Sequence, residues 1–381
     1  MMAEPSICGL VLTGGGARGA YQAGVFKALA EIVPRGTVPF PVITGVSAGA
    51  HNAVGLASNF ESFKNSASKL AQFWTSLRTP QVFDTRMRTM AFTGLRLVFA
   101  EFLPRIFRKS PESLLNNTPL RNALSDNLDF PKIEHAIDTG ALRALSITCS
   151  GYSSGHAVTF FDAPPDTQPW SRSRRDGRRG HLSLDQIMAS SALPLLFPAV
   201  QIGNEYFGDG ALRLTSPLVP AIHLGATRLL IVGTRDTHAT DNPPKQKAGY
   251  PSIGDLGGYA LDTIFHDNLE ADVERLERIN SLIDCQDEAG LVPNGLKRID
   301  VLNINPTRSL RNIALQHVNE MPASLRWIIH RKGAKQALGR LESYLLFEPG
   351  YVQALIDLGY KDTLAKTEDI KAFLCSTNSE T

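Results

Sequence analysis

Two strand–turn–helix units at the start of the chain constrain its fold most strongly. The apolar run "ICGLVL" leads into the glycine-rich stretch "TGGGARG" and a helical pattern from about Arg18 to Ile32. The run "PFPVIT" leads in the same way into "GVSAGA" and a helical pattern over Ala48–Ser58. Short apolar runs bounded by turn residues are typical of buried strands, and the periodic segments between them are typical of covering helices. This alternation predicts an α/β fold with a parallel sheet.

The rest of the chain extends this plan. Strand patterns return in "ALRALSITCS", "ATRLLIVGT" and "LKRIDVLNI", so we expect the sheet to continue beyond residue 220. Residues 60–130 have a helical and irregular pattern, which we interpret as an insertion over one end of the sheet. The Pro-rich and then Arg-rich stretch Ala163–Gly180 predicts a solvated loop. After Pro306 the pattern is helical to near the end of the chain.

The first glycine-rich turn is compatible with two kinds of chemistry. The spacing of Gly14, Gly16 and Gly19 after a strand matches the dinucleotide-binding fingerprint. That fingerprint requires an acidic residue at the end of the second strand, but this strand ends in Thr44 and Gly45. Free backbone amides at a helix N-terminus would equally stabilise the oxyanion that forms during acyl transfer. The turn therefore predicts an anion site and leaves both alternatives open.

The second turn contains a GxSxG pattern that predicts a nucleophile elbow. Ser47 stands between a strand and a helix, and its flanking glycines allow the strained, tight turn that such a serine needs. A second GxSxG contains Ser153 but lies between the strand-like runs "LSIT" and "AVTFF", so it predicts a hairpin turn. Ser47 is therefore the candidate nucleophile. The amides of Gly15, Gly16 and Ala48 are candidates for its oxyanion hole, and that of Ala17 is a further candidate.

The general base is less evident from the residues alone. Several histidines follow Ser47, but none lies in a small-residue loop directly after a strand, and we interpret His51 as a residue on the flank of its helix. In "NEYFGDGALR", Asp209 lies between two glycines, where a tight turn would project its carboxylate. A carboxylate needs partial desolvation and a direct hydrogen bond to the serine to act as its base. An isolated Asp-Gly dipeptide would be read as a simple turn.

Four motifs in this order resemble those of the patatin-like phospholipases and acyl hydrolases. They are "GGGARGAYQAGV", "GVSAGA", "SSALPLLFPAV" and "DGALRLTSP", and the resemblance extends over roughly residues 8–222. It implies a three-layer α/β/α sandwich with a mostly parallel central sheet, to which we add a C-terminal helical extension. It also implies that Ser47 and Asp209 form a catalytic dyad without histidine. One departure is the sequence Asp-Gly-Ala, where many relatives have Asp-Gly-Gly.

The resemblance further assigns an oxyanion loop and a division into domains. The loop comprises Gly14, Gly15, Gly16 and Arg18. The Arg18 side chain could orient the loop or raise its positive potential, or it could be a surface residue in a structural ion pair. We expect a catalytic domain over 8–222, with the helical insertion inside it. Residues 223–381 would supply the remaining strands and a helical region packed on the core.

The implied activity is hydrolysis of fatty-acyl esters of phospholipids, lysophospholipids or neutral glycerides. A soluble carboxylesterase or thioesterase on the same fold is the alternative within the same class. A nucleotide-binding protein and a catalytically silent lipid-binding module are alternatives of other classes. The sequence contains no HExxH, paired-cysteine or EF-hand spacing, so we expect the chemistry to need no metal or other cofactor.

Charge and hydropathy patterns suggest partners and location. Lys and Arg number 39 against 37 Asp and Glu, so no overall positive charge favours nucleic acid as a partner. The segment Arg86–Lys109 interleaves six cationic residues with aromatic and aliphatic ones. This composition suits an anionic membrane surface, although the segment could instead cover the active site. With no basic segment before the first apolar run, we expect a cytoplasmic protein that can contact membranes peripherally.

Overall fold

The central element is one mixed sheet in a computed structural model that describes residues 6–34, 38–60, 62–86, 113–235, 253–288, 296–329 and 339–375. In this part of the chain ten strands form the sheet, with the main order β10-β9-β1-β2-β3-β4-β6-β5. The strands are β1 (Cys8–Leu12), β2 (Val42–Val46), β3 (Ala144–Gly151), β4 (Ala157–Asp162), β5 (Trp170–Arg172), β6 (Arg175–Arg179), β7 (Val200–Ile202), β8 (Glu205–Asp209), β9 (Arg228–Val232) and β10 (Asp300–Ile304). The strands from β10 to β3 pair in parallel, as predicted.

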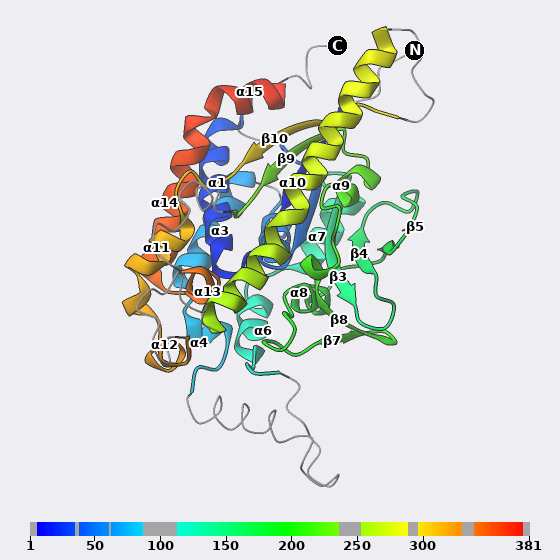
Figure 1. Ribbon diagram of the computed structural model, residues 1–381. Coiled ribbons are helices and arrows are strands. Elements are labelled where there is room, and N and C mark those ends of the chain that lie inside the picture. The colour runs from blue at the N-terminus through cyan, green and yellow to red at the C-terminus, as the bar shows by residue number, and fades with distance from the viewer. Residues whose placement is uncertain are drawn as a thin grey trace.

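Helices cover both faces of this sheet (Figure 1). On one face, Leu10 and Leu12 belong to a hydrophobic cluster with residues of many helices. These helices are α1 (Ala20–Ile32), α2 (Ala48–Ala57), α3 (Phe63–Ser76), α6 (Thr118–Ser125), α7 (Phe130–Asp138), α8 (Leu184–Ser190), α11 (Leu310–Gln316), α12 (Ala323–Ile329), α13 (Arg340–Leu345), α14 (Pro349–Ala365) and α15 (Thr367–Cys375). On the other face, Val11 packs with residues of α9 (Val219–His223) and α10 (Ile253–Glu288). The predicted three-layer α/β/α sandwich is therefore confirmed.

The pairing of β3 brings two strand ends together. Along one edge of β3, β2 pairs in parallel up to Val46, which lies opposite Thr148. Beyond that point β8 pairs with β3 in the antiparallel direction, and Asp209 lies opposite Cys149. The other edge of β3 is occupied by β4 over this whole stretch. Strand β8 therefore pairs with the part of this edge of β3 that lies beyond the end of β2. The last residues of β2 and β8 lie next to each other as a result.

The stretch Ala163–Gly180 forms strands, so the prediction of a solvated loop is wrong. Strands β5 and β6 pair with each other, and β6 pairs in parallel with β4. The Trp170 ring stacks on Phe161, with centroids 4.9 Å apart, and it also covers the backbone of Gly177. Burial of an aromatic ring against the sheet edge stabilises an arrangement that the surrounding Pro and Arg residues do not indicate.

The second half of the chain completes the same sheet. Strands β9 and β10 extend it past β1, and α14 packs lengthwise against α1. The Tyr21 hydroxyl of α1 donates a hydrogen bond to Asp362 of α14 over 3.0 Å. The proposed domain boundary at residue 222 stays a prediction. No helix in the ranges given above is both long and apolar enough to cross a lipid bilayer.

Candidate active site

Ser47 occupies a strained turn between β2 and α2. Its backbone angles are φ 54° and ψ −124°, which non-glycine residues rarely adopt. A side chain at Gly45 would collide with the carbonyl oxygen of Gly49, and one at Gly49 would collide with that of Leu12. The tight turn thus requires both glycines of the pattern, as the elbow interpretation predicts. The serine is 4% exposed.

The last residue of α8 and the segment that follows it hydrogen-bond to both residues of the candidate dyad. The Ser47 amide donates to Ser190 Oγ over 2.8 Å, and the Ser190 hydroxyl donates to the Thr148 carbonyl over 2.7 Å. The Asp209 amide donates to the Ala192 carbonyl over 2.9 Å. Ser190 is fully buried, and we did not predict a role for it from the sequence. The only signal was a pair of serines at the end of a predicted helix.

Asp209 lies at the end of β8, next to the end of β2, and is fully buried. Its Oδ1 accepts a hydrogen bond from the Ala211 amide over 3.0 Å, and its Oδ2 accepts none from any described residue. Burial raises its pKa from 3.8 to about 7, against the smaller lowering effects of the Ala211 amide and the Ser47 hydroxyl. The expected desolvation is therefore present, and the hydroxyl is close enough to affect the carboxyl. A direct hydrogen bond between the two side chains is not formed among the described residues.

The loop Gly14–Gly16 lies against the elbow. A methyl group added at Gly14 would lie 3.0 Å from Ser47 Cβ. The Gly14 carbonyl accepts a hydrogen bond from Thr234 Oγ1 over 2.6 Å, which fixes the orientation of this peptide. Gly16 has φ 55°, and a methyl group there would lie 2.5 Å from the Tyr344 carbonyl oxygen. Only glycine fits this position without strain.

Three backbone amides near Ser47 remain available as donors. Within the described part of the chain, the amides of Gly15, Gly16 and Ala48 donate to no other group. Ala48 follows the serine directly and begins α2. Unengaged amides from a glycine loop and from the residue after the nucleophile are the donors that an oxyanion hole requires.

Arg18 is a buried anchor of this loop and not a surface residue. Its Nη2 lies 3.3 Å from Asp262 of α10, and its Nε donates to Ser343 Oγ of α13 over 2.9 Å. The guanidinium also stacks over the Tyr344 ring at 3.9 Å. The ion pair that we considered is present, but it is buried. Through it, Arg18 ties the glycine loop to two helices from the second half of the chain.

The histidines with described side chains offer no base for Ser47. His51 is buried in α2, and its Nε2 hydrogen-bonds with Ser191 Oγ over 2.8 Å. Burial lowers its pKa from 6.5 to about 4, so its ring is neutral at physiological pH. His51 therefore lies in the protein interior, whereas we expected it on the flank of α2. His223 stacks on Trp170, and His317 pairs with Glu320.

The second GxSxG serine lies on a turn, as predicted. Ser153 is exposed between β3 and β4, and its amide donates to Glu205 Oε1 over 3.1 Å. No helix follows it. A serine in this exposed hairpin lacks the buried surroundings that activate a nucleophile.

An apolar pocket opens beside Ser47. Its open volume, mouth included, is about 610 Å³. Its lining consists of Gly16, Ser47, Ala48, His51, Phe73, Trp74, Leu77, Val82, Leu120, Ser191, Leu193, Phe197, Tyr344, Leu345 and Phe347. Because most of this lining is aromatic or aliphatic, it suits a hydrocarbon chain next to a few polar groups.

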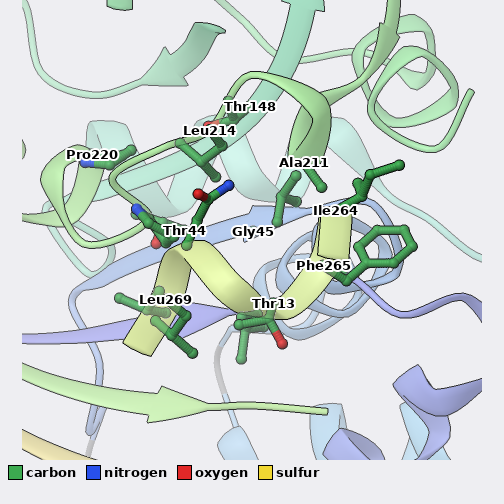
Figure 2. Close-up of a pocket in the computed structure, with 16 residues that line it drawn as sticks. Thr13, Thr44, Gly45, Thr148, Ala211, Leu214, Pro220, Ile264, Phe265 and Leu269 are labelled. Atoms are coloured by element: carbon green, nitrogen blue, oxygen red, sulfur yellow. The ribbon is translucent and has the colours of Figure 1, made fainter. Parts of the chain in front are cut away.

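A second cavity lies between the strand ends and α10 (Figure 2). Thr13, Thr44 and Thr148 line it from the sheet, and Ile264, Phe265 and Leu269 line it from α10. Neither Ser47 nor Asp209 contributes to its lining. The apolar pocket that contains Ser47 is therefore the better candidate for the substrate site.

No metal centre is found within the described ranges. Among these residues, no group of three or more His, Cys, Asp or Glu side chains is arranged to hold a metal ion.

A serine on a strained strand-to-helix turn at the edge of an α/β/α sandwich defines the chain as a hydrolase-like α/β protein. The family model of the patatin-like phospholipases matches residues 10–222. The chain therefore belongs to the patatin-like phospholipase family, as its motifs suggested, and is a lipid acyl hydrolase in general terms.

Two solved structures are similar to this chain over most of its length. VipD from Legionella pneumophila has 14% identity and a TM-score of 0.33, with 96% of this chain and 68% of that chain covered. Human GIVD cytosolic phospholipase A2, solved with methyl gamma-linolenyl fluorophosphonate, has 12% identity and a TM-score of 0.42. That match covers 98% of this chain and 59% of the phospholipase chain. The comparison with curated proteins gives no match.

Proposed function

We propose that the protein is a serine hydrolase of fatty-acyl esters, of the phospholipase A or lysophospholipase type, that acts through Ser47 and Asp209. One observation carries this proposal. The ends of β2 and β8 bring a strained serine and a buried carboxyl group of near-neutral pKa together beside an apolar pocket. A nucleophile, a base and room for an acyl chain are what ester hydrolysis requires.

In the first half of the reaction, Asp209 accepts the proton of the Ser47 hydroxyl as Oγ attacks the ester carbonyl carbon. The carbonyl oxygen becomes an oxyanion, which the amides of Gly15, Gly16 and Ala48 stabilise. The ester bond then breaks, and protonated Asp209 returns the proton to the leaving alcohol oxygen. The acyl group remains bound to Ser47 as an ester.

In the second half, Asp209 accepts a proton from a water molecule that attacks the acyl-enzyme carbonyl. The same amides stabilise the second oxyanion. Ser47 Oγ leaves and recovers its proton from Asp209, and the fatty acid is released. A pKa near 7 suits both steps, because a base of this strength exchanges protons readily at neutral pH.

The lining of the pocket supports a hydrocarbon substrate over a nucleotide. Around Gly16 the pocket walls are mostly aromatic and aliphatic, and they offer no carboxylate to a ribose. Gly14 to Gly16 and Arg18 then serve as the oxyanion loop, in which Arg18 acts by holding the loop in place through Asp262. No cofactor enters this mechanism.

Contact with an anionic membrane remains part of the proposal. The segment Arg86–Lys109 lies outside the described residues, except for Arg86, which is exposed and pairs with Asp84 over 2.7 Å. We further propose a cytoplasmic protein that reaches its lipid substrate peripherally, without nucleic acid as a partner.

Labelling with a fluorophosphonate probe and lipid-product mass spectrometry test the proposed function. Wild type should bind the probe and release fatty acid from mixed phospholipid and glyceride vesicles. The Ser47→Ala and Asp209→Asn variants should do neither, and the matched control Ser153→Ala should behave as wild type. Labelling of Ser47→Ala, or loss of labelling in Ser153→Ala with the fold intact, would assign the nucleophile elsewhere. No labelling of folded wild type would favour a catalytically silent lipid-binding module.

A further inference from the structure

A polar groove adjoins the apolar pocket that contains Ser47. The groove has an open volume of about 1120 Å³, larger than the pocket. Its lining includes Gly55, Asn59, Lys69, Leu124, Asp129 and Lys132. His51 and Phe73 line both hollows. The two hollows therefore meet at these two side chains.

Helix α2 runs from one hollow to the other. Ser47 lies in the pocket, His51 lines both hollows, and Gly55 lies in the groove. Residues four apart lie on the same face of a helix, about 6 Å apart along its axis. His51 is therefore one helical turn from the nucleophile, and the groove begins beyond it.

A second helix shows the same progression. On α6, Leu120 lines the pocket and Leu124, one turn later, lines the groove. On α3 the two hollows lie on different faces: Trp74 and, just after the helix, Leu77 line the pocket, Lys69 and Ser76 line the groove, and Phe73 lines both. Helices α2 and α6 thus agree that the groove continues the pocket past His51 and Phe73.

The chemistry of the lining changes at this boundary. On the far side, Lys69 donates to Asn59 Oδ1 over 2.5 Å, and Lys132 pairs with Asp129 at 3.3 Å. A hydrocarbon chain in the groove would displace water from these charged and amide groups, which costs free energy. On the near side, aromatic and aliphatic side chains surround the chain. The apolar surface that can bind an acyl chain therefore ends at His51 and Phe73.

The His51 ring is held at this boundary. Its Nε2 hydrogen-bonds with Ser191 Oγ over 2.8 Å, and the Ser191 hydroxyl also lies 3.1 Å from the Ile187 carbonyl. Phe73 packs edge-on against Trp74, with centroids 6.4 Å apart. A hydrogen bond thus holds the His51 ring in place and packing holds the Phe73 ring, so neither ring moves aside easily at the end of the apolar pocket.

We propose that His51, together with Phe73, closes the far end of the acyl pocket and limits the length of the acyl chain that the enzyme accepts. This inference rests on the proposed function, because it assigns the apolar pocket to the acyl group of the substrate. The property that matters is the bulk of the side chain at position 51.

Hydrolysis of nitrophenyl esters of increasing chain length, from butanoyl to hexadecanoyl, tests this limit. Wild type should lose kcat/KM beyond a given length. In His51→Ala and in Phe73→Ala, the ratio of kcat/KM for the longer to the shorter esters should rise about tenfold. His51→Leu, which keeps a similar volume, should retain the wild-type profile. Lys69→Ala, a control in the groove alone, should also retain it.

Binding of octanoic and hexadecanoic acids, in the Ser47→Ala background, separates this inference from the proposed function. Adding His51→Ala should raise the affinity for hexadecanoic acid relative to octanoic acid about tenfold. The same profile in wild type and both truncated variants, with thermal unfolding showing intact folds, would overturn the chain-length limit. Absence of ester hydrolysis by wild type would overturn the proposed function, while the binding ratio still decides the inference. Ser191 keeps the Ile187 carbonyl as a partner in His51→Ala, so the variant should fold.

Discussion

Replacing Asp209 with asparagine is expected to remove activity. It should also make the protein more stable relative to wild type as the pH rises, whereas replacing a carboxyl group of lowered pKa has the opposite effect. Burial raises the pKa of Asp209 from 3.8 to about 7, so the folded protein holds this proton more tightly than the unfolded chain. Below the pKa that Asp209 has in the unfolded chain, its carboxyl group is protonated in both the folded and the unfolded protein, and burial of the neutral group costs no stability. As pH rises toward 7 the unfolded chain ionises first, and the wild type loses stability.

The magnitude follows from the interval between the two pKa values. Each pH unit within it costs the wild type ~1.4 kcal/mol, so the loss between pH 3.8 and about 7 totals about 4 kcal/mol. Above the folded pKa the loss is constant. The Asp209→Asn variant has no ionisable group here and escapes this loss. Its unfolding free energy relative to wild type should therefore rise with pH by about 4 kcal/mol over the full interval.

Urea unfolding of both proteins over this pH range, at fixed ionic strength, measures the effect. The difference between variant and wild type isolates Asp209, because all other titrating groups are shared. In parallel, kcat/KM of wild type for a soluble ester should rise with pH and level off above about 7, because only ionised Asp209 accepts the serine proton. A difference in unfolding free energy that stays constant with pH would refute the assigned burial of a titrating Asp209. Activity that is flat across neutral pH would refute its role as the base.

Three further predictions concern the support of Ser47, the role of metals and the membrane. Ser190→Ala should lower the unfolding free energy by about 1–3 kcal/mol and reduce kcat for a soluble ester, because the Ser47 amide and the Thr148 carbonyl lose their hydrogen-bond partner. Urea unfolding measures the first effect, and steady-state kinetics measures the second. Hydrolysis of a soluble monomeric ester should survive EDTA without added calcium, and a strict calcium requirement would contradict the amide-based mechanism. Reversing Arg105, Arg108 and Lys109 to Glu should weaken sedimentation with anionic vesicles in a salt-dependent way and leave soluble-ester turnover unchanged. Equal sedimentation of wild type and this variant would leave the segment without a role in membrane binding.

The local features of this protein were accessible from its sequence. The elbow at Ser47 could be predicted because its requirement is met within five residues: a strand before the serine, a helix after it and glycines where side chains would collide. The parallel strands could be predicted because apolar runs and turns recur in order along the chain. The hairpin of β5 and β6 was not predicted, because the Trp170 ring that stabilises it stacks on Phe161 of β4. No local sequence pattern indicates that contact.

The sequence by itself determined the strand-to-helix turns, the sheet type and the identity of the candidate serine, because glycine geometry and hydrophobic periodicity act over a few neighbouring residues. Only the tertiary structure decided that β8 takes the place of β2 beside β3, which brings Asp209 to Ser47. It also decided that Asp209 is buried enough for its pKa to approach 7, and that His51 lines the apolar pocket. Proximity and desolvation arise from the packing of segments far apart in the chain, so no local pattern contains them.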